Sequence, residues 1–188
     1  MGIGKRVKEA IEKMQTADPE AAWIPTSIAL DATAKKEYPN VKKVGERYKK
    51  FIHENFRLIS RLAFGGVTIG RMHLGYQHPD IKIDDKGTCS IEEILYHAVR
   101  CGLLHEGNLP KNLRFVRRNI IQRKEGVLIL PSSMIYGIII AVIVAPSNAG
   151  ETIKGTLSCK YRGKVIDLNS IWGKKDKLDD FLFKNSSK

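Results

Sequence analysis

The chain has 188 residues, of which 43% are hydrophobic and 28% are charged. A chain of this size and composition can bury a substantial core as one domain, so disorder is excluded for most of its length. Its 32 lysines and arginines exceed its 20 aspartates and glutamates and give a net charge of +12. Such an excess attracts polyanions, so RNA, DNA and an anionic membrane all fit, as does a basic surface that binds nothing.

The three cysteines, Cys89, Cys101 and Cys159, indicate a reducing environment. They lie far apart in the sequence and lack the spacing of a metal finger, so we interpret them as free thiols. The first residues lead directly into an amphipathic pattern and show no secretion signal. We therefore expect a cytoplasmic protein that uses no metal and no cofactor.

Three helices are predicted in the first third of the chain. Apolar residues at helical spacing run from Ile3 to Met14 and stop before Asp18-Pro19. A second helical stretch covers residues 20–36, in which Pro25 should break or kink the helix. After a turn at residues 38–40, a long helix follows from Asn40, with one apolar face that extends to Leu62.

A loop rich in glycine is expected from residue 65 to residue 87. It lacks the Gly-Lys-Ser/Thr ending of a nucleotide-binding loop, and we interpret its histidines, His73 and His78, as loop residues without metal-ligand spacing. His53 and Glu54, on the preceding helix, would approach the next helix if the two packed in a bundle.

The next helix, over residues 90–106, has the clearest start in the sequence. Ser90-Ile91-Glu92-Glu93 is a capping box, in which a serine and a glutamate satisfy each other's exposed amide groups. Gly107 must end the helix. Arg100 and His105 therefore lie on its final turns.

The remaining chain mixes β-prone and helical segments. Residues 113–121, 127–130 and 155–167 predict a small antiparallel β element. The apolar run 134–145 is shorter than the roughly 20 residues that span a bilayer, which favours a buried central helix over a membrane anchor. We expect a helical core over residues 1–145 and an appendage over 146–183. The appendage ends in a short helix at 177–183 and precedes a disordered tail, 184–188.

Arg100 and His105 have the chemistry that phosphodiester cleavage needs. An imidazole transfers a proton near neutral pH, while a guanidinium stabilises an oxyanion. In an α-helix, however, five residues rotate the two side chains apart by roughly 140° and separate them by about 7.5 Å. The pair would need either a last turn loosened by Gly102 or a second copy of the helix across a two-fold axis.

Residues 91–107 and their Arg-x4-His spacing resemble HEPN domains (higher eukaryotes and prokaryotes nucleotide-binding). The resemblance implies a mainly α fold, a HEPN-like antiparallel helical bundle, over positions 1–145. It is silent about the C-terminal third, where the β-prone segments predict a small β-hairpin, and we assign residues 1–188 to a single HEPN-like domain. The resemblance also implies a homodimer formed through the motif helix and a metal-independent endoribonuclease that leaves 2′,3′-cyclic phosphate ends. Arg100 and His105 would be catalytic, and the protein would act in defence, in stress or as a toxin restrained by an antitoxin protein. Cys101 departs from the polar residue that many active members carry after the arginine.

Two alternatives remain from the sequence. The first is a non-catalytic HEPN-like module that binds RNA or nucleotide, or a dimeric scaffold. In the second, Arg100 simply pairs with Glu92 or Glu93, and His105 caps the helix C-terminus.

A basic cluster follows the motif and is the candidate RNA-binding surface. Its residues could hold phosphates that flank a scissile bond, or they could form a solvated edge that discourages strand pairing. The candidate residues are Lys111, Arg114, Arg117 and Arg118, followed by Arg123 and Lys124.

Overall fold

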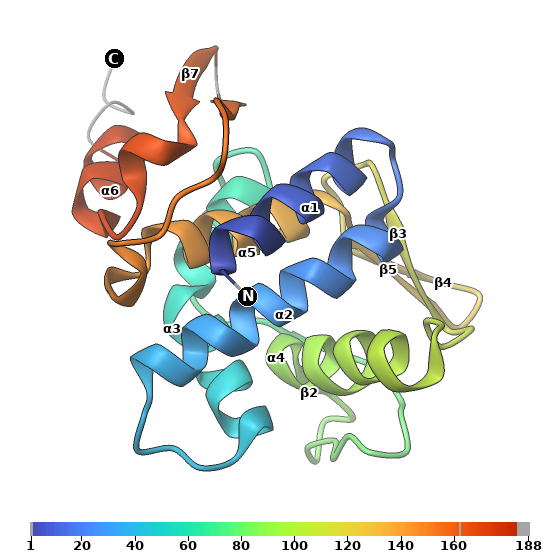
Figure 1. Ribbon diagram of the computed structural model, residues 1–188. Helices are drawn as coiled ribbons and strands as arrows, with labels where there is room; N and C mark the ends of the chain where they lie inside the picture. Colours follow the sequence, from blue (N-terminus) through green and yellow to red (C-terminus); the bar gives the residue numbers. More distant parts are fainter. Residues whose placement is uncertain (1, 162, 184–188) are drawn as a thin grey trace.

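The computed structural model describes residues 2–161 and 163–183, and it is mainly helical (Figure 1). The expected disordered tail, 184–188, lies outside these residues. The helices are α1 (Ile3–Gln15), α2 (Pro19–Glu37), α3 (Val44–Ala63), α4 (Ile91–Glu93), η1 (Ile94–Glu106), α5 (Ser133–Val144), η2 (Pro146–Asn148), η3 (Leu168–Ile171) and α6 (Lys175–Phe183). The strands are β1 (His73–Leu74), β2 (Cys89–Ser90), β3 (Leu113–Val116), β4 (Gln122–Lys124), β5 (Val127–Pro131), β6 (Ser158–Tyr161) and β7 (Lys164–Asp167).

Helix α5 forms the centre of the core, as the apolar run 134–145 predicted. It contacts α1, α2 and α3, and nearly all of its residues are buried (Figure 1). Gly137 lets α5 approach α3 closely, because a Cβ at this position would lie 2.7 Å from the carbonyl oxygen of Ile59. No helix among the described residues is both long and apolar enough to cross a membrane.

The first three helices follow the sequence prediction with two corrections. Pro25 does not break the second helix: α2 continues from Pro19 to Glu37 with Pro25 buried inside it. A proline removes only one backbone donor, and the packing of α2 against α1, α3 and α5 maintains the helix around it. The third helix begins at Val44 rather than Asn40, because the N-cap residue Lys43 is extended and Arg47 Nη1 donates to the carbonyls of residues 41 and 42.

The prediction of a small antiparallel β element is partly wrong. Strands β3, β5 and β4 form a mixed sheet with β5 in the centre, in which β3 runs parallel to β5 and β4 antiparallel to it. Residues 117–121, also predicted as β-prone, follow β3 outside the sheet. The sheet falls within the segment expected to be a helical core, so that segment is not purely helical.

The C-terminal segment agrees with the sequence prediction. Strands β6 and β7 form the expected hairpin in the C-terminal third, and α6 begins two residues before the predicted 177. Both lie at the opposite end of the molecule from the β3–β5–β4 sheet (Figure 1).

Candidate functional site

The helix that carries Arg100 and His105 is wound as a π-helix. It begins with the single α-helical turn α4 and continues as η1, a π-helix of 13 residues; we call α4 and η1 together the motif helix. A π-helix bonds residue i to residue i+5, so residues five apart lie one turn above each other. The α-helical separation expected from the sequence therefore does not apply, and a single helix brings the pair together without a second copy.

Arg100 and His105 are in direct contact within one chain. Arg100 Nη1 donates to Nε2 of His105 at 3.1 Å. Because a guanidinium has only donors, Nε2 must be the acceptor, so a neutral His105 ring in this contact carries its proton on Nδ1. His105 is exposed, whereas only 15% of the Arg100 side chain is.

Asp31, on α2, fixes the position of Arg100. Its Oδ2 accepts from Arg100 Nη2 at 3.0 Å, and the ring of Tyr96 lies 5.6 Å from the guanidinium carbon. Burial raises the pKa of Asp31, against the opposing effect of the Arg100 hydrogen bond and charge. Asp31 Oδ1 and Arg100 Nε are buried and have no hydrogen-bond partner among the described residues. The ion pair therefore holds Arg100 through one contact rather than two.

The two residues that follow Arg100 have local structural roles. Arg100 Nη1 also lies 3.9 Å from the Cys101 sulfur, so Cys101 is a weak acceptor beside the guanidinium. Gly102 is buried, and a Cβ there would lie 2.9 Å from the carbonyl oxygen of Asn108. Gly102 thus admits the close approach of the returning chain after the helix. Gly107, at a φ of +75°, ends the helix as predicted.

The first turn of the motif helix carries a second group of polar contacts. Glu92, whose side chain is only 8% exposed, contacts Nδ1 of His53 at 2.9 Å. Ser90 accepts from the Glu93 amide as the capping box predicts. The Glu93 carboxylate instead contacts Lys49 at 2.8 Å and His97 at 3.2 Å. Both glutamates are therefore engaged elsewhere, and the expectation that one of them pairs with Arg100 is wrong.

The basic cluster is exposed on and around the mixed sheet. Lys111 precedes β3, Arg114 lies on β3, and Arg117 and Arg118 follow it. Within the described residues, the structure shows no hydrogen bond or ion pair that involves these four side chains. Arg100 and His105 lie toward the C-terminal end of the motif helix. The mixed sheet lies beyond this end of the helix (Figure 1).

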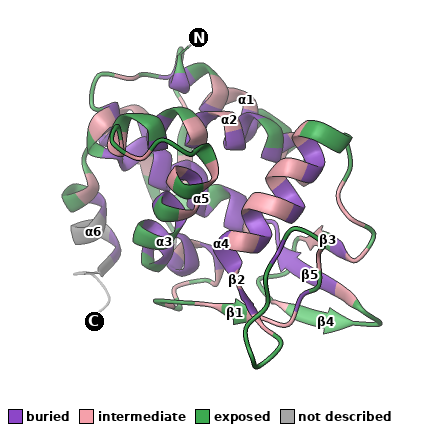
Figure 2. Ribbon diagram, turned by 90° about the horizontal axis from the view of Figure 1, so that it is seen from below, coloured by how far each residue is buried: buried purple, intermediate pink, exposed green. Residues whose placement is uncertain are grey.

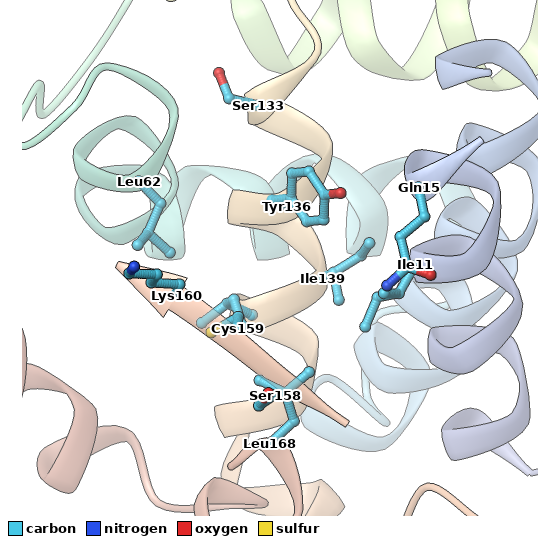
Figure 3. Close-up of a pocket in the computed structure, with 11 residues that line it drawn as sticks. Ile11, Gln15, Leu62, Ser133, Tyr136, Ile139, Ser158, Cys159, Lys160 and Leu168 are labelled. Atoms are coloured by element: carbon cyan, nitrogen blue, oxygen red, sulfur yellow. The ribbon is translucent and has the colours of Figure 1, made fainter. Parts of the chain in front are cut away.

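A cavity of about 350 Å³ lies between α1, α3, α5 and β6 (Figure 3). Its lining is mainly apolar and includes Ile11, Ile139 and Leu168, with Lys160 at one side. Ser133 also lines it, but its hydroxyl donates to the Ala63 carbonyl at 2.8 Å. Neither Arg100 nor His105 contributes to this cavity.

Sequence reasoning missed the partner of Arg100 at the C-terminal end of the motif helix and was half right at the N-terminal end. Asp31 lies far from Arg100 in sequence, and nothing in its neighbourhood marks it as a partner. His53 was expected to approach the motif helix together with Glu54. His53 does so, but Glu54 accepts instead from the Tyr38 hydroxyl at 2.7 Å.

The chain belongs to the Rv1289 family, whose pattern it matches over residues 2–188. Three mycobacterial relatives are each 23% identical to it over 187 residues, which cover 97% of this chain and 88% of the relative. They are the uncharacterized proteins Mb1320 of Mycobacterium bovis and MT1327 and Rv1289 of two Mycobacterium tuberculosis strains. No solved structure matches the chain.

Proposed function

We propose that the chain is a metal-independent endoribonuclease of the HEPN type. The contact of 3.1 Å between Arg100 and His105 carries this proposal. It brings an exposed proton-transfer group against a permanent cation. It arises from π-helical winding, which is rare in proteins and, in its usual form of a single-turn bulge, is often found at functional sites. The exposed cluster Lys111, Arg114, Arg117 and Arg118 supports RNA as the substrate.

In the proposed reaction, the ribose 2′-oxygen attacks the adjacent phosphorus. The bond between the 2′-oxygen and phosphorus forms while the bond to the 5′-oxygen breaks, which leaves a 2′,3′-cyclic phosphate. One imidazole accepts the 2′-hydroxyl proton and another donates a proton to the leaving 5′-oxygen. Arg100 stabilises the charge that develops on the phosphoryl oxygens. In a homodimer through the motif helix, His105 of each copy would supply one of the two imidazoles.

The first experiment is incubation of structured RNA with the purified protein in excess EDTA, followed by analysis of the 3′ ends. We expect wild type to produce cyclic phosphate ends. The His105→Ala and Arg100→Ala variants should each lose at least about 100-fold in rate, the usual contribution of one proton-transfer group and of one group that stabilises the developing negative charge. His78→Ala is the matched control, because His78 lies in the loop between β1 and β2, outside the motif helix. Equal cleavage by wild type and His105→Ala would overturn the proposal.

The second candidate is a non-catalytic module that binds RNA or nucleotide, or serves as a dimeric scaffold. The ion pair with Asp31 favours it, because this contact gives Arg100 a structural role that needs no substrate. The same proteins distinguish the two functions. A folded wild type that binds RNA without cleaving it would support the second candidate.

The biological setting follows from the same proposal. A ribonuclease without a metal requirement acts as soon as it folds, which suits a toxin or a defence effector held inactive by a protein antitoxin. Expression of wild type should arrest growth of the host cell, whereas expression of His105→Ala at the same level should not.

A further inference from the structure

A pocket of about 450 Å³ lies at the first turn of the motif helix. Three segments that are distant in sequence form it: helix α3, the chain around β1, and the start of the motif helix. Figure 2 shows the ribbons of α3, β1 and α4 in the same part of the molecule. Most of its lining residues are charged or titratable: Lys49, Lys50, His53, Arg71, His73, Glu92 and Glu93. Met72 and Ser90 complete the lining. Neither Arg100 nor His105 lines it.

His53 is held at this pocket by a buried carboxylate. Its Nδ1 contacts Glu92 Oε1 at 2.9 Å, and Glu92 is 8% exposed while His53 is 47% exposed. A carboxylate accepts only, so His53 must donate from Nδ1, which leaves Nε2 as its remaining ring nitrogen. A buried acceptor of this kind fixes both the tautomer and the orientation of an imidazole.

The cations of the pocket differ in how far they are neutralised. Lys49 contacts Glu93 at 2.8 Å, and Lys50 lies 3.8 Å from Glu54. Arg71 is exposed and takes part in no ion pair or hydrogen bond that the structure shows among the described residues. It is therefore the cation most available to a ligand.

We propose that this pocket binds the phosphate group of a small phosphorylated molecule. Arg71 offers the forked donors that match phosphate oxygens, and Lys50 supplies a second cation. Protonated His53 donates from Nε2, and Glu92 positions its ring. This inference is independent of the proposed ribonuclease, because it uses none of the residues assigned to RNA cleavage.

Calorimetric titration with inorganic phosphate at constant ionic strength tests the site. We expect saturable binding with one phosphate per chain, weakened about tenfold in Arg71→Gln, which corresponds to the loss of about 1.4 kcal/mol. Lys13→Gln is the matched control, because it removes one exposed positive charge at the end of α1. Absence of saturable binding, or equal weakening by the two variants, would overturn the proposal.

The ligand chemistry is resolved by comparing inorganic phosphate with ribose 5-phosphate and adenosine 5′-monophosphate. Binding of all three with the same dependence on Arg71 would assign the pocket to the phosphate group itself. Tighter binding of only the nucleotide would extend the site to the base. Binding of all three that is insensitive to Arg71→Gln would contradict the assignment.

The role of His53 is tested with His53→Gln. We expect this variant to bind inorganic phosphate more weakly than wild type, because it removes the ring Nε2 that the contact with Glu92 positions. Binding equal to that of wild type would overturn the role of His53.

The phosphate site and the ribonuclease site can be tested independently of each other. Arg100→Ala and His105→Ala should bind phosphate as wild type does, whatever their effect on RNA cleavage. If these variants lose phosphate binding while they remain folded, the pocket is not a separate site, and the inference is wrong.

Discussion

The two ends of the motif helix each place a histidine beside a charged side chain, but they do so differently. At the C-terminal end, Arg100 and His105 come from the same helix and are joined by its π-helical winding. At the N-terminal end, His53 and Glu92 come from different helices and are joined by packing. A local contact depends on the backbone conformation of one segment, whereas a contact between elements depends on the whole fold.

The two ends also differ in what is buried. At one end the cation is largely buried and its histidine partner is exposed; at the other the carboxylate is buried and its histidine partner is half exposed. Arg100 depends on Asp31 to compensate its charge, while the charge of Glu92 is compensated by His53 when that ring is protonated. Removing the compensating group should therefore lower the free energy of unfolding most at the Arg100 end, where Asp31 is that group, because a guanidinium cannot lose its charge.

The largest effect is expected for Asp31→Ala. This variant leaves Arg100 partly buried without its anion, and we expect the free energy of unfolding to fall by about 2 kcal/mol, below the range for fully buried pairs. Urea denaturation measures the change. Asp85→Ala, which removes an exposed carboxylate from the loop, should change stability by less than about 0.5 kcal/mol. An equal effect of both variants would show that the ion pair does not stabilise the helix end.

Gly102→Ala tests whether the C-terminal end depends on close backbone packing. The new Cβ would lie 2.9 Å from the Asn108 carbonyl oxygen, so the chain after the helix must move. We expect a loss of about 1 to 2 kcal/mol, typical of overpacking. The NMR signals of His105 should shift while those of His53 stay unchanged.

Gly150→Ala is the control for this experiment, because a Cβ there has no heavy atom within 4 Å. If Gly102→Ala were as stable as Gly150→Ala, the chain at Asn108 could not lie as close to Gly102 as the structure places it.

A smaller loss in the free energy of unfolding is expected for Glu92→Gln, at the N-terminal end of the motif helix. The amide oxygen can still accept from Nδ1 of His53, and His53 stays solvated, so the loss in stability should be less than about 1 kcal/mol. Urea denaturation measures the loss. A loss as large as that of Asp31→Ala would contradict the smaller role of the contact between His53 and Glu92.

The sequence was informative where structure depends on local pattern. The apolar run 134–145 predicted α5, the first amphipathic pattern predicted α1, and Gly107 marked the end of the motif helix. Ser90 predicted the start of that helix correctly, because a capping serine acts within one turn.

Sequence reasoning was weaker where the outcome depends on tertiary packing. Pro25 has a poor helical propensity that the packing of α2 overrides. The parallel pairing of β3 with β5 depends on how the chain between them turns. At the candidate site, the spacing of Arg100 and His105 was visible, but their contact depends on a π-helix for which the hydrophobic pattern gave no signal. Asp31 could not be identified at all, since packing alone brings α2 to the motif helix.

The smallest expected effect concerns His97, which lies between the two ends. Burial lowers its pKa from the ordinary value of 6.5, against the opposing charge of Glu93, whose carboxylate lies 3.2 Å away. Between the lowered pKa and 6.5, the unfolded chain binds more protons than the folded one, so stability rises with pH across this window and is lost as pH falls through it. NMR titration should find the pKa of His97 below 6.5, and Glu93→Gln should lower this pKa further by removing the carboxylate in contact with the ring. A rise in the pKa of His97 in that variant would show that Glu93 does not favour the protonated ring, and the contacts of the first turn would then need a different assignment.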